Sequence, residues 1–255
     1  MQVLTALHTD VGIRKQTNQD SLLLKVAQTS VGKVVLAVVC DGMGGLEKGE
    51  LASATVISAF SKWFDKDLPP LLQNQNWNEI QARWNLLLKE QNQRIGEYGK
   101  RLNINLGTTF SGLLIIDEHF FLIGHVGDTR VYKIDSKLEL LTEDQTLVNR
   151  EVQRKNLTPE QAEKDPRRNV LLQCLGASRV VEPQFISGKP TLHTVFMLCS
   201  DGFRHMISKE EIYQAFAPEK LMTEQQMKNK AIELVELNKV RNETDNISII
   251  LIKVD

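Results

Sequence analysis

The sequence predicts an α+β fold built on antiparallel sheets, because candidate strands and helices come in blocks and do not alternate one by one. Two strands and two helices fill the first third of the 255 residues, four short strands follow, and helical signals return near residue 158. The short polar connections between the middle strands are typical of hairpins. No Gly/Ser-rich or Pro-rich linker divides the chain, so we expect a single domain over residues 1–255.

The first third supplies two strands and two amphipathic helices. Residues 3–9 partly alternate between apolar and polar, and residues 33–40 are a β-branched run typical of a buried strand. Residues 50–64 and 77–98 carry apolar side chains at helical spacing, and we interpret their tryptophans as helix packing. The pair Pro69-Pro70 is expected to mark the stop after the first helix.

The rest of the chain alternates between strand blocks and capped helices. Thr158, Ser208 and Thr223 are each followed three residues later by Gln or Glu, which predicts a helix N-terminus at each. Strands are expected over residues 108–116, 119–125, 130–134, 138–141, 191–199 and 246–252.

Composition excludes several classes of protein. The chain has 31 Lys and Arg against 32 Asp and Glu, a formal net charge of −1, which disfavours a nucleic-acid binder. Its N-terminus lacks a secretory pattern, and its longest aliphatic run, residues 34–40, is far too short to span a membrane. The three cysteines form no CxxC pair. We therefore expect a reduced, cytoplasmic protein that binds neither nucleic acid nor membrane.

The most informative feature is the placement of aspartates at the ends of predicted strands. Asp41, Asp128 and Asp201 each follow a strand and lie beside a glycine, and Asp245 immediately precedes the last strand. Any one of these could be an ordinary turn, since Asp and Gly both favour turns. Four together predict a carboxylate cluster, which needs a compensating cation. Oxygen ligands without His or Cys favour Mg²⁺ or Mn²⁺ over zinc, and glycine would let a backbone carbonyl approach the ion.

Other candidate groups carry less information. Arg14, in the loop over residues 12–21, is a planar donor suited to phosphate. Cys40 and Cys199 end apolar strands outside any Cys-x5-Arg loop, so we interpret them as core residues. The five histidines show no metal-ligand spacing, and structural roles are expected for each, although His205 is close in sequence to Asp201.

Taken in order, the motifs resemble those of the metal-dependent protein phosphatases of type 2C (PPM), in the form of the bacterial branch. Each motif is weak alone, but their fixed order from Gly12 to Ile250 is specific. The matching segments are Arg14 with Asn18-Gln19-Asp20-Ser21, Asp41-Gly42-Met43-Gly44-Gly45, Gly49-Glu50, Ala52-Ser53, Gly107-Thr108-Thr109, Gly127-Asp128-Thr129-Arg130, Leu141-Thr142 with Asp144, Asn169-Val170-Leu171, Leu175-Gly176, Ser200-Asp201-Gly202 and Thr244-Asp245-Asn246-Ile247-Ser248.

The resemblance implies a four-layer αββα sandwich of two antiparallel β-sheets flanked by helix pairs, with a flap over about residues 146–176. It implies a dinuclear Mn²⁺ or Mg²⁺ centre in a cleft at one end, and a third ion in bacterial members. By position, Arg14 would hold the substrate phosphate and Asp128 would contribute to the third site. The remaining implied residues are the metal ligands Asp41, Gly42, Asp201 and Asp245, and the outer groups Asp20 and Asn246.

Two positions depart from the family pattern. Many eukaryotic members carry a proposed general acid, His, after the first Asp-Gly, but here the residue is Met43, which has no proton to donate. The resemblance to the bacterial form suggests that metal-bound water or solvent protonates the leaving group. Gln19 replaces the family's Glu before Asp20, which leaves one fewer carboxylate.

The implied function is hydrolysis of phosphoserine and phosphothreonine in proteins, by attack of a metal-activated water. Phosphorylated proteins, and a serine/threonine kinase that modifies them, are then the expected partners. Two alternatives stay open. One is a catalytically impaired pseudophosphatase acting as a regulatory binding module, which would usually have lost a metal aspartate. The other is a hydrolase of small phosphoesters on the same fold.

Overall fold

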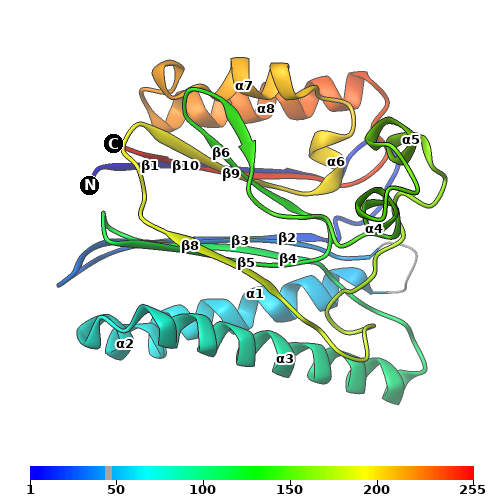
Figure 1. Ribbon diagram of the computed structural model, residues 1–255, viewed down its shortest axis with the longest axis horizontal. Coiled ribbons are helices and arrows are strands. Elements are labelled where there is room, and N and C mark those ends of the chain that lie inside the picture. Colours follow the sequence, from blue (N-terminus) through cyan, green and yellow to red (C-terminus); the bar gives the residue numbers. More distant parts are fainter. Residues whose placement is uncertain (44–47) are drawn as a thin grey trace.

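The computed structural model describes residues 1–43 and 48–255, which fold into four layers, two sheets between two sets of helices (Figure 1). One antiparallel sheet has the strand order β1-β10-β9-β6-β7 and the other β2-β3-β4-β5-β8. The strands are β1 (Val3–Asp10), β2 (Asp20–Thr29), β3 (Gly32–Asp41), β4 (Phe110–Ile116), β5 (Phe120–Val126), β6 (Arg130–Ile134), β7 (Leu138–Leu140), β8 (Gln184–Gly188), β9 (Thr194–Cys199) and β10 (Ile247–Val254).

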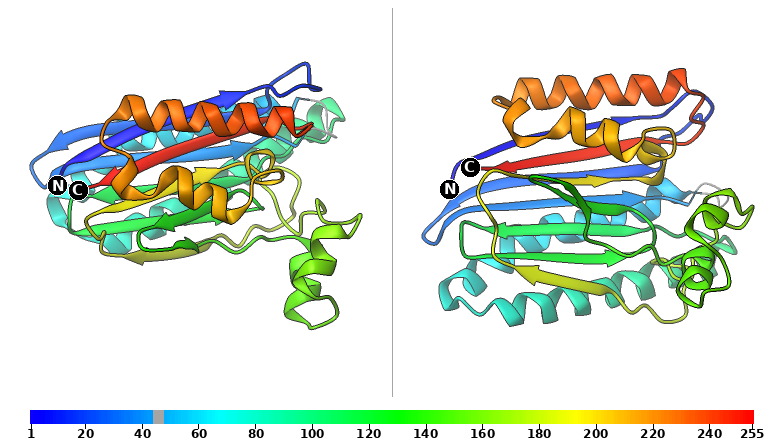
Figure 2. Two further views of the ribbon diagram at one scale, coloured as in Figure 1. Left: turned by 90° about the horizontal axis from the view of Figure 1, so that it is seen from above. Right: turned by 45° about the horizontal axis from the view of Figure 1, so that its top comes forward.

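Helices cover the outer face of each sheet, which confirms the expected αββα sandwich. The β2–β8 sheet is covered by α1 (Gly49–Lys66), α2 (Leu68–Asn74) and α3 (Trp77–Leu102). The other sheet is covered by α6 (Asp201–Arg204), α7 (Lys209–Phe216), the 3₁₀ turn Pro218–Lys220 and α8 (Glu224–Val240). Helices α4 (Leu147–Gln153) and α5 (Pro159–Lys164) lie within the predicted flap and project beyond one end of the sheets (Figure 2).

Three apolar clusters hold the layers together. Between the sheets, alternate residues of the central strands pack face to face, among them Val35, Ile115 and Ile250. Beneath α1 and α3, Trp84 packs edge-on against Phe60 and Trp63, which confirms the packing role expected for these tryptophans. A third cluster fills the space under α7 and α8. Central strands are therefore buried on both faces, which explains their continuous apolar runs.

The two strands that sequence analysis missed, β2 and β8, are the edges of one sheet. Most residues of both are only partly buried, so their sequences lack the clear period-two alternation of a half-buried strand. The short helix α4 was missed as well. Buried strands and helices have strong hydrophobic patterns in the sequence, whereas edge strands have weaker ones.

The helix caps were predicted well, whereas the proline pair was not. Thr158 and Ser208 form complete capping boxes, and the Thr223 hydroxyl accepts a hydrogen bond from Gln226 N. Helix α1 does end at Lys66, just before Pro69-Pro70, but the pair also lies in the first turn of α2, which the sequence did not predict. Proline is favoured there, since its preset φ suits a helix and its missing N–H has no partner in the first turn.

The topology gathers the predicted aspartates at the end of the sandwich near the flap. Asp41 ends β3, Asp20 begins β2, Asp201 follows β9 and Asp245 precedes β10. These strand ends lie at the same side of the molecule in Figure 1. Within the described ranges no helix is long and apolar enough to cross a membrane.

Candidate active site

Asp20 and Asp41 are the first pair of carboxylates that the fold brings together. They occupy directly opposed positions in the β2–β3 ladder, where Cβ atoms of facing residues are roughly 4.5–5.5 Å apart. On its other side Asp41 is fixed to Thr109: Asp41 N donates to Thr109 Oγ1 at 2.9 Å, and Thr109 N donates to Asp41 O at 2.9 Å. The strand register therefore sets the position of both acids.

Asp201 and Asp245 come from the neighbouring strands of the other sheet. Asp201 begins α6 two residues after β9, and Asp245 lies two residues before β10. Two serines hold these ends together, with Ser200 N donating to Ser248 O at 3.1 Å and Ser248 N donating to Ser200 Oγ at 3.0 Å. The four acids thus come from both sheets and face the same end of the sandwich.

Asn246 connects the 11–19 loop to this end. Its amide Nδ2 donates to Val11 O at 2.9 Å and to Thr17 O at 3.2 Å, and its Oδ1 accepts from Gln19 N at 2.9 Å. Because Asn246 is buried, losing these bonds would leave several polar groups unpaired. Asn246 therefore positions the loop that precedes Asp20.

The glycines of the two Asp-Gly pairs are required by close backbone contacts. A Cβ on Gly42 would lie 2.5 Å from the carbonyl oxygens of Gln19 and Gly49, and one on Gly202 would lie 2.2 Å from Asn246 O. No side chain fits at such distances. Sequence analysis explained these glycines by access of a carbonyl to a metal, whereas the structure shows that they let the site's segments pack against each other.

Burial and mutual repulsion raise the pKa values of the acids. Burial, with the charge of Asp201 next in effect, raises the pKa of Asp128 to about 7. Burial and the charges of Asp201 and Asp245 raise the pKa of Asp20 to about 7, and burial and Asp20 raise that of Asp41 well above its ordinary value. Among residues 1–43 and 48–255, both carboxylate oxygens of Asp20 and Oδ1 of Asp201 are buried without a hydrogen-bond partner. Burying carboxylate oxygens in this way is costly unless a cation compensates their charge.

The donor set fits a hard divalent cation. It offers carboxylate and carbonyl oxygens without His or thiolate, as Mg²⁺ and Mn²⁺ prefer. In the part of the chain that is described, however, no three acidic, His or Cys side chains already converge into a closed cage. Asp245 Oδ1 instead lies 3.0 Å from Lys15 Nζ.

Lys15, the residue after the predicted Arg14, thus places a cation on one of these carboxylates, Asp245. Arg14 is exposed to solvent, and its guanidinium forms no ion pair with the acids among the described residues. Lys15 lies in the same loop with its ammonium group on Asp245. Sequence analysis did not consider Lys15, since lysine lacks the bidentate geometry that singled out Arg14.

His205, which sequence analysis noted only for its closeness to Asp201, and Glu243, which it missed, also belong to this site. His205 Nδ1 lies 3.2 Å from Glu243 Oε2, and its Nε2 lies 3.6 Å from Asp201 Oδ2. Glu243 Oε1 accepts from Thr244 N at 2.7 Å and from Asp245 N at 2.9 Å. These contacts tie Asp201 to the turn that carries Asp245. The i,i+4 spacing from Asp201 to His205 was the available signal.

Asp128 is held beside the site by an arginine network. Arg204 Nη2 donates to Asp128 O at 3.3 Å and lies 3.5 Å from Asp144 Oδ2. Arg130 binds both oxygens of Asp144, at 2.8 and 2.7 Å. Asp128 is itself buried, and Arg204 Nη2 lies 4.0 Å from its Oδ2.

The remaining sequence predictions concern Met43 and the cysteines. Met43 N donates to Gly107 O at 3.0 Å, while Gly44 and Gly45 of the same motif lie outside the described residues. Cys40, Cys174 and Cys199 are free and buried. Burial raises the pKa of the Cys199 thiol to about 12 and that of Cys40 well above its ordinary value, so neither is a ready nucleophile.

Comparison with known proteins decides the family. The family model described as "Protein phosphatase 2C" matches residues 12–236. The chain belongs to the protein phosphatase 2C family. This makes it a protein phosphatase, and the motif resemblance is confirmed. The protein phosphatase PhpP of Streptococcus pneumoniae is 32% identical over 210 residues, which cover 81% of each chain.

Solved structures agree with this assignment. The serine/threonine phosphatase of S. agalactiae superposes with a TM-score of 0.85 at 28% identity, over 100% of both chains. The catalytic domain of the serine/threonine protein phosphatase PstP, in complex with 2 manganese ions, gives a TM-score of 0.80 at 26% identity over 99% of both chains. Phosphatases of this fold thus include a manganese-bound member.

Proposed function

We propose that this member of the protein phosphatase 2C family hydrolyses phosphoserine and phosphothreonine in proteins, with Mn²⁺ or Mg²⁺ held by its aspartates. The observation that carries the proposal is the set of buried, unpartnered carboxylate oxygens on Asp20 and Asp201, beside Asp41. Relatives named as serine/threonine phosphatases support the substrate class. A serine/threonine kinase acting on the same proteins follows as the opposing partner.

Each site residue then has a proposed role. Asp41 would bridge two ions, and Asp201, Asp245 and the carbonyl of Gly42 would complete their protein ligands. Asp20 would order the water around the ions through its charge. Asn246 would hold the 11–19 loop in place. Asp128 would serve a third ion. When bound, the ions would lower the pKa of a nucleophilic water and stabilise the charge on the phosphoryl oxygens.

The chain's cations would orient the phosphate. Arg14 stays the predicted phosphate-binding residue, and Lys15 offers a second positive charge at Asp245. Neither Met43 nor the buried cysteines can move a proton to the leaving oxygen at neutral pH, so protonation from water remains the proposed route.

No observation favours the two alternatives. A pseudophosphatase would be expected to have lost a metal aspartate, but Asp41, Asp201 and Asp245 are all present at one end of the fold. A small phosphoester hydrolase predicts similar kcat/KM values for p-nitrophenyl phosphate and a phosphothreonine peptide. We expect the peptide to exceed the small ester by about tenfold or more, because contacts remote from the phosphate can contribute to transition-state binding. Equal values, measured by phosphate release with Mn²⁺, would favour the small-ester alternative.

Replacing Lys15 tests whether its ammonium group competes with the metal. We expect Lys15→Met to tighten Mn²⁺ binding by about two- to fivefold, the size typical of a partly exposed ion pair. Titration calorimetry on metal-free protein measures the affinity. Arg14→Met is the matched control, because it removes the same charge from the neighbouring position, and it should change the affinity less. Weaker binding in Lys15→Met, or equal effects of both variants, would contradict the competition.

A further inference from the structure

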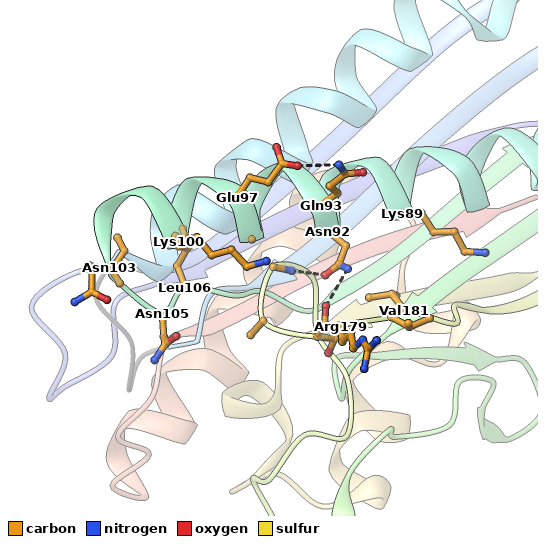
Figure 3. A pocket seen from close by; sticks show the side chains of 17 residues that line it. Lys89, Asn92, Gln93, Glu97, Lys100, Asn103, Asn105, Leu106, Arg179 and Val181 are labelled. Atoms are coloured by element: carbon orange, nitrogen blue, oxygen red, sulfur yellow. Dashed lines mark hydrogen bonds between the residues drawn. The ribbon is translucent and has the colours of Figure 1, made fainter.

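A hollow of about 920 Å³ lies outside the aspartate site, between α3 and residues 176–181 (Figure 3). The C-terminal half of α3 forms one wall and the segment after the predicted flap forms the other. Asn92 joins the two walls, since its Oδ1 accepts from Gly176 N at 2.8 Å and its Nδ2 donates to Ser178 O at 3.0 Å. The hollow therefore has a fixed shape and is not a gap between unconnected segments.

The lining of this hollow is positively charged. Lys89, Lys100 and Arg179 line it, against a single carboxylate, Glu97. Glu97 Oε1 is already engaged along the helix, accepting from Gln93 Nε2 at 2.8 Å. The ion pairs of residues 1–43 and 48–255 involve none of the three cations. They are available to an anionic ligand.

A short stretch of backbone links the lining of the hollow to the aspartate site. Its lining includes Leu106 and Gly176. Two residues beyond Leu106, Thr108 donates through Oγ1 to Asp41 O at 2.9 Å and pairs with Leu175. Two residues of backbone span at most about 7 Å, so the edge of the hollow lies on the order of 10 Å from the backbone carbonyl of Asp41.

We propose that this hollow docks an acidic segment of the phosphoprotein substrate, an inference that rests on the proposed function. Side-chain amides of Asn103 and Asn105 add hydrogen-bonding groups for a peptide backbone. An extended peptide advances about 3.3 Å per residue, so carboxylates about three to five residues from the phosphorylated residue would enter the near side of the hollow, within the field of its cations. Charge complementarity of this kind sets substrate choice and association rate.

The test compares phosphothreonine peptides that differ only in their flanks. Three peptides carry Asp at positions three to five before the phosphothreonine, at the same positions after it, or at neither. With the Mn²⁺-loaded enzyme we expect one acidic peptide to have a KM about tenfold below that of the neutral peptide. The triple variant Lys89→Gln, Lys100→Gln, Arg179→Gln should abolish this preference while leaving kcat and p-nitrophenyl phosphate turnover unchanged.

A matched control separates a local site from a general effect of net charge. The triple variant Lys189→Gln, Lys209→Gln, Lys228→Gln removes three exposed cations away from the hollow and should keep the preference. Loss of the preference in this control, or no preference in the wild type, would overturn the proposal. If tripolyphosphate competes for the three cations and neither acidic peptide is favoured, the hollow is an anion site for another ligand, and the proposal is wrong. Absence of any phosphopeptide turnover would instead count against the proposed function.

Discussion

Replacing Asp41 or Asp201 by asparagine is expected to lower kcat on a phosphothreonine peptide by about 10³-fold or more, which corresponds to about 4 kcal/mol of transition-state stabilisation. Both acids lie at the end of the sandwich nearest the predicted flap. Asp41 is opposite Asp20 on one neighbouring strand and is hydrogen-bonded to Thr109 on its other side. Asparagine keeps the shape of the side chain but removes the charge that would hold a dication. Phosphate release at saturating Mn²⁺ measures the effect.

Asp65→Asn is a suitable control for these two variants, because Asp65 is exposed and its ion pair, with Lys25, lies on the helical face of the sheet. It should retain wild-type turnover. Calorimetry should also show that Asp41→Asn and Asp201→Asn weaken Mn²⁺ binding. If either variant keeps more than about a tenth of the wild-type kcat, its aspartate does not have the proposed role.

The metal-free protein should become more stable when Asp20 loses its charge. The pKa of Asp20 is raised from 3.8 to about 7, so the folded state binds a proton that the unfolded state has released. The stability that this proton contributes is fully present below pH 4 and is lost as the pH rises to about 7. At pH 8 the penalty for the buried charge is about 4 kcal/mol, from roughly three pKa units.

Asp20→Asn should therefore raise the free energy of unfolding at pH 8 by about 1–3 kcal/mol, since burying an unpartnered amide offsets part of the gain. At pH 4 the gain should vanish. Urea unfolding of metal-free protein at both pH values measures this. Burial lowers the pKa of His125 to about 4, so its effect on the pH dependence of stability is opposite to that of Asp20. Because His125 is present in both proteins, this effect cancels when they are compared.

Asp135→Asn is a control variant for which we expect the opposite change in the free energy of unfolding. A hydrogen bond from Lys133 lowers the pKa of Asp135, so the charged form is favoured in the folded state and its removal should cost stability at pH 8. If Asp20→Asn destabilises the metal-free protein at pH 8 as Asp135→Asn does, then the carboxylate of Asp20 is already compensated and the cluster does not require a cation.

The sequence was most informative where buried strands end in charged residues. Asp41, Asp201 and Asp245 stand out because each lies within two residues of an apolar run, and the topology brings those strand ends together. His205, Glu243 and Lys15 gave no such signal, since their roles depend on contacts between segments far apart in the chain, such as the Lys15–Asp245 pair. Sequence analysis missed the edge strands β2 and β8 for a related reason, because a half-exposed strand need not alternate between apolar and polar residues. Local patterns thus predicted the acids that we propose to bind the metal ions, whereas the groups that position them could be found only in the folded structure.

The central claim is that the aspartates at this end of the sandwich hold the dications on which phosphopeptide hydrolysis depends. The most direct measurement strips the protein with a chelator and then follows phosphate release from a phosphothreonine peptide while Mn²⁺ is added. We expect no turnover in the stripped protein, a saturable rise with added Mn²⁺, and no rise in Asp41→Asn or Asp201→Asn. Full turnover after chelation, or an unchanged Mn²⁺ response in both variants, would contradict the claim.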